Sequence, residues 1–293
     1  MTPVQRQHVL RLLATLVLVA PPLALRGQTA RAADSSWVAR LKDGSTHVGA
    51  LSRETPDSVE LTTSSGRITI ARSFIARLRH VSNTELHDGA YWPQDPHDTR
   101  LFFGPTGRTL DAHTGYFTDF YLFFASVSYG VTDRFTLGGG LSLFPSSDFS
   151  NNVFFFTPKV ALVRHERFNV AAGALVGFAG KATGSAGLLY LAASNGTSDN
   201  AFTYGAGWSY SGDRVYGGPT LLLGGTRRIA RHVSLMSEAY VTTGKDGGYV
   251  LPVYGLRFLG ESLSADLGFF NVFGRNVDAF FPGIPWVGFA LKF

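Results

Sequence analysis

Five charged residues and one tyrosine lie singly within apolar stretches of the second half of the chain: Lys159, Glu238, Tyr240, Arg257, Asp266 and Lys292. Each shares its sequence parity mainly with small or polar neighbours, whereas most large apolar residues have the other parity. Residues of one parity share one face of a β-strand, so these groups are predicted to line a polar face. Opposite charges across a narrow bore create a field that selects ions or small solutes, and they serve equally as ion pairs that fill an interior. Both alternatives remain open.

The histidines indicate no nucleophilic chemistry. A serine nucleophile needs a histidine base within hydrogen-bonding reach. His113 is predicted to lie in a long outer loop, and His165 and His232 in short turns, away from any strand interior. We therefore predict no catalytic residue and no enzymatic activity.

A second group of potential ligands lies between residues 80 and 98. Its members carry nitrogen or oxygen donors that a metal accepts: His80, His87, Asp88, Asp95, His97 and Asp98. The segment holds Gly89, Pro93 and Pro96, and it offers neither a regular scaffold nor a histidine pair at i and i+4. We predict a solvated linker over residues 83–98, with no metal and no cofactor.

The elements that must position the six polar residues are strands. In residues 202–210, bulky residues alternate with Thr203, Gly205, Gly207 and Ser209. In a soluble protein, the strand face opposite the bulky side chains would carry charged residues and not glycine, serine and threonine. The bulky face is therefore predicted to contact lipid. Residues 99–293 can be threaded as twelve such strands. Residues 102–106 are either the first strand or a lead-in to it.

The connections alternate in length. Five are short, at residues 132–134, 164–167, 195–200, 228–232 and 260–264. Six are mostly longer, at residues 108–115, 145–152, 180–185, 211–218, 243–248 and 274–283. Short periplasmic turns and longer outer loops are typical of transmembrane barrels, whose closure leaves no unpaired strand edge in lipid. The fold class predicted is therefore all-β, an antiparallel transmembrane barrel of about twelve strands.

The last strand, residues 285–293, ends on an aromatic residue. Val287, Phe289, Leu291 and Phe293 share one face, and Trp286, Gly288, Ala290 and Lys292 share the other. This strand resembles the closing strand of bacterial outer-membrane β-barrel proteins. The resemblance implies that Phe293 is an assembly signal, that the barrel-assembly machinery and outer-membrane lipid are partners, and that the lumen is of the porin kind. Outer-membrane phospholipases share this architecture, but no serine–histidine pair matches theirs.

Residues 1–32 have the parts of a secretory signal peptide. Arg6 and Arg11 precede an apolar run over residues 12–25, and Ala30-Arg31-Ala32 offers a cleavage site. This segment carries four of the five net positive charges, so the basic balance indicates no nucleic-acid partner. The chain has no cysteine, which excludes disulfides and thiol chemistry.

Residues 35–82 are predicted to form a separate domain of five short strands. The pattern Leu-x-Asp-Gly, Gly-x-Leu and Gly-x-Ile resembles SH3-like or Sm-like small barrels. Sm-like proteins bind RNA, but few aromatic residues are available here to stack bases, and an exported domain meets no RNA. We expect a periplasmic domain, with a possible periplasmic protein partner. For the whole chain we expect an outer-membrane pore for small solutes or ions, or else a structural or surface-binding barrel without conductance.

Overall fold

The computed structural model describes residues 36–81, 85–144, 152–179, 185–215, 217–242, 248–274 and 280–293. The predicted signal peptide, residues 1–32, lies outside the described residues. The described chain forms two compact units that divide between Gln94 and Asp95. No helix among the described residues is long and apolar enough to cross a membrane.

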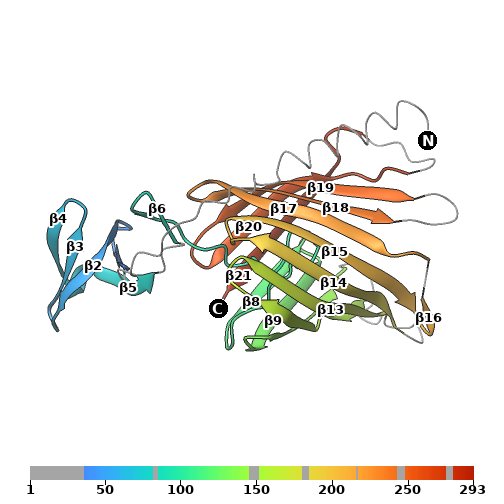
Figure 1. The fold of residues 1–293 in the computed structure, drawn as a ribbon, viewed down its shortest axis with the longest axis horizontal. Coiled ribbons are helices and arrows are strands. Elements are labelled where there is room, and N and C mark those ends of the chain that lie inside the picture. Colours follow the sequence, from blue (N-terminus) through green and yellow to red (C-terminus); the bar gives the residue numbers. More distant parts are fainter. Residues whose placement is uncertain are drawn as a thin grey trace. The chain divides into compact units, whose positions relative to one another are not determined.

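The first unit is a five-stranded antiparallel sheet in the order β4-β3-β2-β1-β5 (Figure 1). Its elements are β1 (Ser36–Leu41), β2 (Thr46–Glu54), β3 (Ser58–Thr63), β4 (Gly66–Ala71), the 3-10 turn η1 (Arg72–Phe74) and β5 (Ile75–Val81). A hairpin of β6 (Leu86–His87) and β7 (Ala90–Tyr91) follows. Ala39, Val59, Leu61 and Ile70 form a core of this unit. Five strands occur where five are expected, and the likeness to SH3-like or Sm-like barrels stays a prediction.

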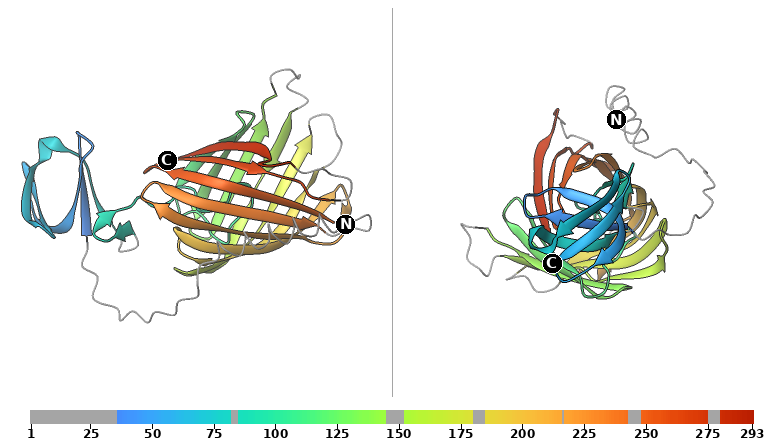
Figure 2. Two further views of the ribbon diagram at one scale, coloured as in Figure 1. Left: turned by 90° about the horizontal axis from the view of Figure 1, so that it is seen from above. Right: turned by 90° about the vertical axis from the view of Figure 1, so that its left-hand side faces the viewer.

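The second unit is a closed antiparallel barrel of twelve strand positions (Figure 1, Figure 2). They are β8 (Gly115–Phe120), β9 (Phe124–Thr132), β10 (Phe135–Ser142), β11 (Val153–Phe156) with β12 (Lys159–Arg164), β13 (Phe168–Ala179), β14 (Ala186–Gly196), β15 (Asn200–Ser211), β17 (Thr220–Ala230), β18 (Val233–Thr242), β19 (Tyr249–Leu259), β20 (Leu263–Phe270) and β21 (Ile284–Lys292). β11 and β12 share one position, because both pair with β10 and β13. The short β16 (Arg214–Val215) pairs with β15 alone.

The barrel closes between its last and first strands. β21 pairs with β8, and Gly115 and Phe293 exchange two backbone hydrogen bonds of 3.0 and 2.8 Å. We call the end of the barrel that holds Phe293 the C-terminal rim. All five predicted short turns join strands at this rim. The prediction of an all-β antiparallel barrel of about twelve strands is confirmed.

The two faces of the wall differ as predicted. Tyr204 and Trp208 are 43% and 45% exposed on the outer face, whereas Thr203 on the inner face is fully buried. The last strand behaves in the same way, with Leu291 exposed and Ala290 buried. The outer surface of the closed barrel is therefore an apolar belt, and the inner face carries the small and polar residues.

The predicted threading needs correction over residues 99–131, where only the lead-in interpretation of residues 102–106 agrees with the structure. Residues 99–107 are not a wall strand, and residues 116–131 fold back as the hairpin β8–β9. Its turn places Tyr121 and Leu122 at φ 54° and 63°, a conformation that sequence normally signals with glycine or asparagine. With this shift, residues 108–115, including His113, lie at the C-terminal rim and not in an outer loop: the backbone N–H of His113 donates to the carbonyl of Gly130.

Candidate functional site

Residues 95–110, here called the inner segment, lie inside the barrel. They bond to inward-facing side chains on strands around the ring, from β8 and β10 to β18 and β19. The segment turns back on itself, since the N–H of Thr106 donates to the carbonyl of Thr99 and that of Leu101 to the carbonyl of Gly104. Residues 102–104 form its tip, residues 95–101 form its first leg, and residues 105–110 form its second leg. The lumen thus contains a hairpin of the protein's own chain.

Arg257 on β19 holds the first leg of the inner segment. Its Nε and Nη2 donate to the two carboxylate oxygens of Asp266, its cross-strand neighbour on β20, at 2.7 and 2.9 Å. Its Nη1 donates to Asp95 at 2.9 Å, and further donors reach the carbonyls of His97 and Leu101 at 2.9 Å. The side chain is only 1% exposed. A guanidinium with this many partners is stably buried, because its charge and its donors are both satisfied.

Glu238 on β18 holds the tip. Its carboxylate oxygens accept the backbone N–H groups of Phe103 and Gly104, each at 3.0 Å, and the hydroxyl of Tyr240 donates to it at 3.3 Å. Glu238 is fully buried. A Cβ at Gly104 would lie 2.7 Å from the Tyr240 hydroxyl, so the tip approaches the wall as closely as glycine allows.

Lys159 on β12 contacts the opposite side of the same leg. Its ammonium donates to the carbonyl of Thr99 at 2.8 Å, and the Thr99 hydroxyl bonds that of Tyr116 on β8 at 2.8 Å. Lys292 is paired in register with Tyr116 on the inner face, and it is half-buried. Lys159 and Arg257, on opposite sides of the lumen, therefore both bond to residues 99–101.

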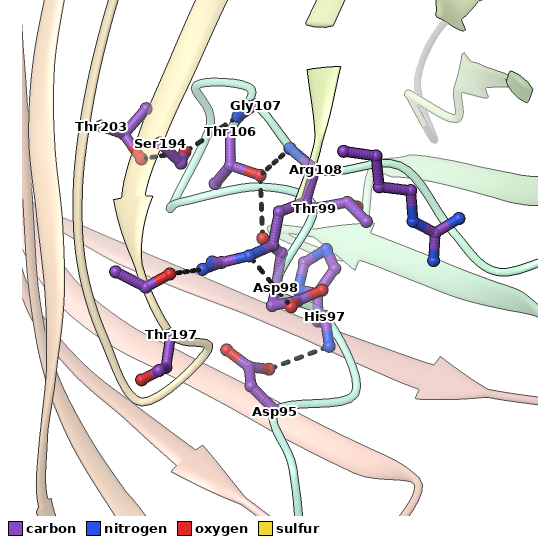
Figure 3. A network of polar contacts seen from close by, with 12 residues as sticks. Asp95, His97, Asp98, Thr99, Thr106, Gly107, Arg108, Ser194, Thr197 and Thr203 are labelled. Carbon is purple, nitrogen blue, oxygen red and sulfur yellow. Dashed lines mark hydrogen bonds and ion pairs between the residues drawn. The ribbon is translucent and has the colours of Figure 1, made fainter. Parts of the chain in front are cut away.

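The second leg runs along β14 (Figure 3). The N–H of Gly107 donates to the hydroxyl of Ser194 at 2.9 Å, and that hydroxyl bonds Thr203 at 2.7 Å. Arg108 donates to the carbonyl of Gly196 at 2.7 Å and lies 3.7 Å from the carboxylate of Asp98. The leg fits only without a side chain at residue 107, since a Cβ there would lie 2.2 Å from the carbonyl oxygen of Asn169.

The enclosure changes the proton affinity of two groups on the inner segment. Burial, and then the cations Arg100, Arg257 and Lys159, hold the pKa of His97 well below its usual range. Its ring packs edge-on against Tyr116 at 4.7 Å between centroids. Burial also lowers the pKa of Arg100 to about 10, so Arg100 stays charged at neutral pH while His97 stays neutral.

Away from the C-terminal rim, the lumen face becomes apolar. Leu101, Phe102, Phe120, Met236, Val253 and Trp286 form one buried cluster, and Phe124, Leu251 and Phe270 pack against it. Strand register places all of these wall residues on the inner face, in line with Glu238 and Arg257. The described lumen face is therefore charged near the C-terminal rim and aromatic beyond it, which differs from the uniformly polar lumen expected.

The structure brings three of the six predicted lumen residues onto the inner segment, Lys159, Glu238 and Arg257, and Asp266 is linked to it through Arg257. Tyr240 joins them through Glu238, whereas Lys292 makes no hydrogen bond or ion pair with the segment. That these residues line a conducting path stays a prediction. Their partners Asp95, Thr99 and Phe103 were missed, and the closest signal was the loss of period-two alternation over residues 99–116.

The prediction of a solvated linker is wrong at the end of this segment, because Asp95 and His97 are buried inside the barrel. Asp95 binds Arg257, and the carboxylate of Asp98 faces Arg108. Within the described ranges, no three His, Asp or Glu side chains form a group that could hold a metal. His113 contacts the Tyr129 hydroxyl, and His232 contacts the carbonyl of Leu259.

No protein-family model matches the chain, and no curated protein matches it significantly. Solved structures similar to it include the KdgM porin in complex with disordered oligogalacturonate. That porin is 12% identical over 61% of this chain and 98% of its own, with a TM-score of 0.46. OmpT of Vibrio cholerae, expressed in the outer membrane, is 14% identical over 89% and 95% of the two chains, with a TM-score of 0.35. A loop-deletion mutant of OmpT, 13% identical over 88% and 96%, has a TM-score of 0.37. At these values the likeness implies nothing about what this chain carries.

Proposed function

We propose that this chain is an outer-membrane β-barrel protein that passes small solutes or ions through a lumen narrowed by the inner segment. The main observation in support is that the barrel has apolar side chains on its outer face and charged side chains on its inner face, the reverse of a soluble protein. Large apolar side chains such as Leu189, Leu267 and Val287 are 54%, 48% and 47% exposed on the outside, whereas the charged side chains Glu238 and Arg257 are buried inside. Lipid around the barrel accounts for this arrangement, and water does not.

The mode of attachment of the inner segment supports a passage. The segment is held by side chains such as Glu238, Arg257 and Ser194, and not by a ladder of strand pairing with the wall. Such contacts are independent of the backbone hydrogen bonds that close the barrel. The wall can therefore persist while the segment shifts, and the width of the lumen depends on where the segment lies.

The remaining parts of the proposal follow from the orientation of such barrels. The C-terminal rim, with its short turns, would face the periplasm, and the five-stranded unit would be a periplasmic domain that docks a protein partner. Phe293 would serve recognition by the barrel-assembly machinery. A catalytic role is not proposed, since His113 and His232 contact a tyrosine hydroxyl and a backbone carbonyl.

A structural barrel without conductance is the second candidate. The complete burial of Phe102 within the lumen, together with that of Arg257, favours it. Single-channel recording of the purified full chain in a planar bilayer separates the two. Discrete conductance steps in KCl are expected from the passage, and a bilayer that stays closed at every salt and voltage would support the structural role.

A further inference from the structure

Arg100 is a charged group in the lumen with unused donors. Its guanidinium carbon lies 4.0 Å above the centre of the Phe120 ring, and no hydrogen bond or ion pair to its side chain occurs among the described residues. Its Nε is buried and without an acceptor. The other cations around the inner segment, Arg257, Arg108 and Lys159, each donate to carboxylates or carbonyls. Among these four cations, Arg100 is thus the one whose side chain has no acceptor in the described part of the chain, and it is half-buried.

A second donor without an acceptor belongs to Trp286, whose ring packs against that of Phe120. The indole N–H of Trp286 is buried and has no acceptor in the described part of the chain, and Trp286 itself is 9% exposed. Its ring centroid lies 5.3 Å from that of Phe120 and 6.3 Å from that of Phe102. A tryptophan N–H only donates, and buried tryptophan usually finds an acceptor. Two donors that lack acceptors therefore flank Phe120.

The wall around these donors is apolar. Phe124, Leu251 and Phe270 pack against the cluster and remain partly exposed on the lumen face. Glu238 and Asp266 attract Arg100 from a distance, but each carboxylate is already bonded, to backbone N–H groups and to Arg257 respectively. A ligand that supplies an acceptor to Arg100 and Trp286 would therefore also contact apolar side chains.

We propose that the lumen binds an amphipathic carboxylate, with its carboxylate on Arg100 and its apolar tail against Phe124, Leu251 and Phe270, here called the apolar band. The Trp286 N–H supplies a further donor to the carboxylate. A carboxylate matches the fork of a guanidinium, and a hydrocarbon tail is stabilised by leaving water. A small inorganic anion leaves the band uncovered, and a neutral hydrocarbon leaves Arg100 without an acceptor. The inference rests on the proposed function, because it names the class of solute that the passage would carry.

Calorimetric titration of the full chain in lipid nanodiscs tests the site without any requirement for conductance. The probes are 4-phenylbutyrate and decanoate, which distinguish an aromatic from an aliphatic tail, and empty nanodiscs correct for partition into lipid. The neutral 4-phenylbutanol and the tailless acetate are the matched controls. We expect at least one of the two tailed carboxylates to bind about tenfold or more tightly than either control. The proposal is overturned if neither 4-phenylbutyrate nor decanoate binds more tightly than 4-phenylbutanol.

Two variants locate the site. Arg100→Gln is expected to weaken binding of the carboxylate about tenfold or more and to leave 4-phenylbutanol unchanged. Trp286→Phe keeps an aromatic ring in the cluster but removes the N–H together with part of the indole, and it is expected to weaken binding several-fold. Arg227→Gln, an exposed position on β17, is the control for loss of a positive charge. Unchanged affinity in Arg100→Gln would refute the assignment.

Binding without conductance would contradict the passage and leave the site standing. Conductance without binding would do the reverse. The comparison of the four compounds on the unmodified chain decides the proposal even where a variant fails to fold.

Discussion

Arg257 illustrates what a buried charge needs inside this barrel. Its position and that of Asp266 follow from sequence parity, because period-two alternation assigns both to the inner face. Their direct pairing follows from the register of β19 and β20. The bond to Asp95 could not be predicted, since 162 residues separate the two and Asp95 belongs to no strand. At the residue scale, sequence therefore predicted the face and missed the partner.

Arg257→Gln should destabilise the barrel strongly. The change leaves the carboxylates of Asp95 and Asp266 buried without their cation, and breaking a buried pair costs about 3–5 kcal/mol. Urea unfolding in lipid vesicles, followed by tryptophan fluorescence, measures the loss. The exposed Arg227→Gln is expected to change stability by less than about 0.5 kcal/mol. Equal stability of both variants with the natural chain would show that the ion pair does not anchor the inner segment.

At the scale of elements, the wall strands and the inner segment differ in whether their sequences alternate between apolar and polar residues. The wall strands alternate and were predicted, whereas the segment has no period, and its residues 102–106 were predicted to be either a first strand or a lead-in to it. The β8–β9 turn was missed for a related reason, because Tyr121 and Leu122 adopt left-handed backbone conformations that their types rarely signal. Glycines mark close approaches of the segment to the wall, but their sequence positions do not reveal which glycine meets which strand.

Gly107→Ala should loosen the second leg of the inner segment. The new methyl group would lie 2.2 Å from the carbonyl oxygen of Asn169 and 2.8 Å from the backbone N of Ser194, so backbone must move. Overpacking of this kind costs about 1–3 kcal/mol. Cleavage by trypsin after Arg100 or Arg108 reports the loosening, because both arginines are enclosed in the docked segment. Gly139→Ala, whose nearest neighbour would be 3.4 Å away, is the matched control and should stay protected. Protection of both variants would contradict the close fit.

Acid should release the first leg. The pKa of His97 lies well below that of an unfolded histidine because of burial and nearby cations, so its neutral form stabilises the docked state. This contribution is present above about pH 6.5 and is lost as the pH falls toward the lowered pKa. Trypsin cleavage after Arg100, measured from pH 7.5 to 5 and divided at each pH by cleavage of a free arginyl peptide, is expected to rise as the pH falls. His97→Phe, which keeps a ring against Tyr116, should give a flatter profile, and an unchanged slope would exclude His97 as the titrating group.

At the scale of the whole molecule, an apolar belt encloses a lumen that holds its own chain. Sequence predicted the closed barrel and its short turns, because alternation and turn length are local properties. It did not predict that the lumen would be occupied, since occupation depends on contacts such as that of Glu238 with Phe103, 135 residues apart. Three of the charged residues first interpreted as lumen lining, Lys159, Glu238 and Arg257, are in the folded chain also the anchors of the inner segment.

The conductance of a variant with a shortened inner segment shows whether that segment narrows a passage through the barrel. Thr99 and Thr106 are hydrogen-bonded across the two legs, so residues 100–105 can be replaced by Gly-Gly as a two-residue turn. The replacement removes the tip with Phe102 and Phe103 and keeps the Lys159 and Ser194 contacts. In planar bilayers, we expect small conductance steps for the natural chain and steps several-fold larger for the variant. Equal conductance of the two proteins, or silence of both, would contradict a passage narrowed by the inner segment.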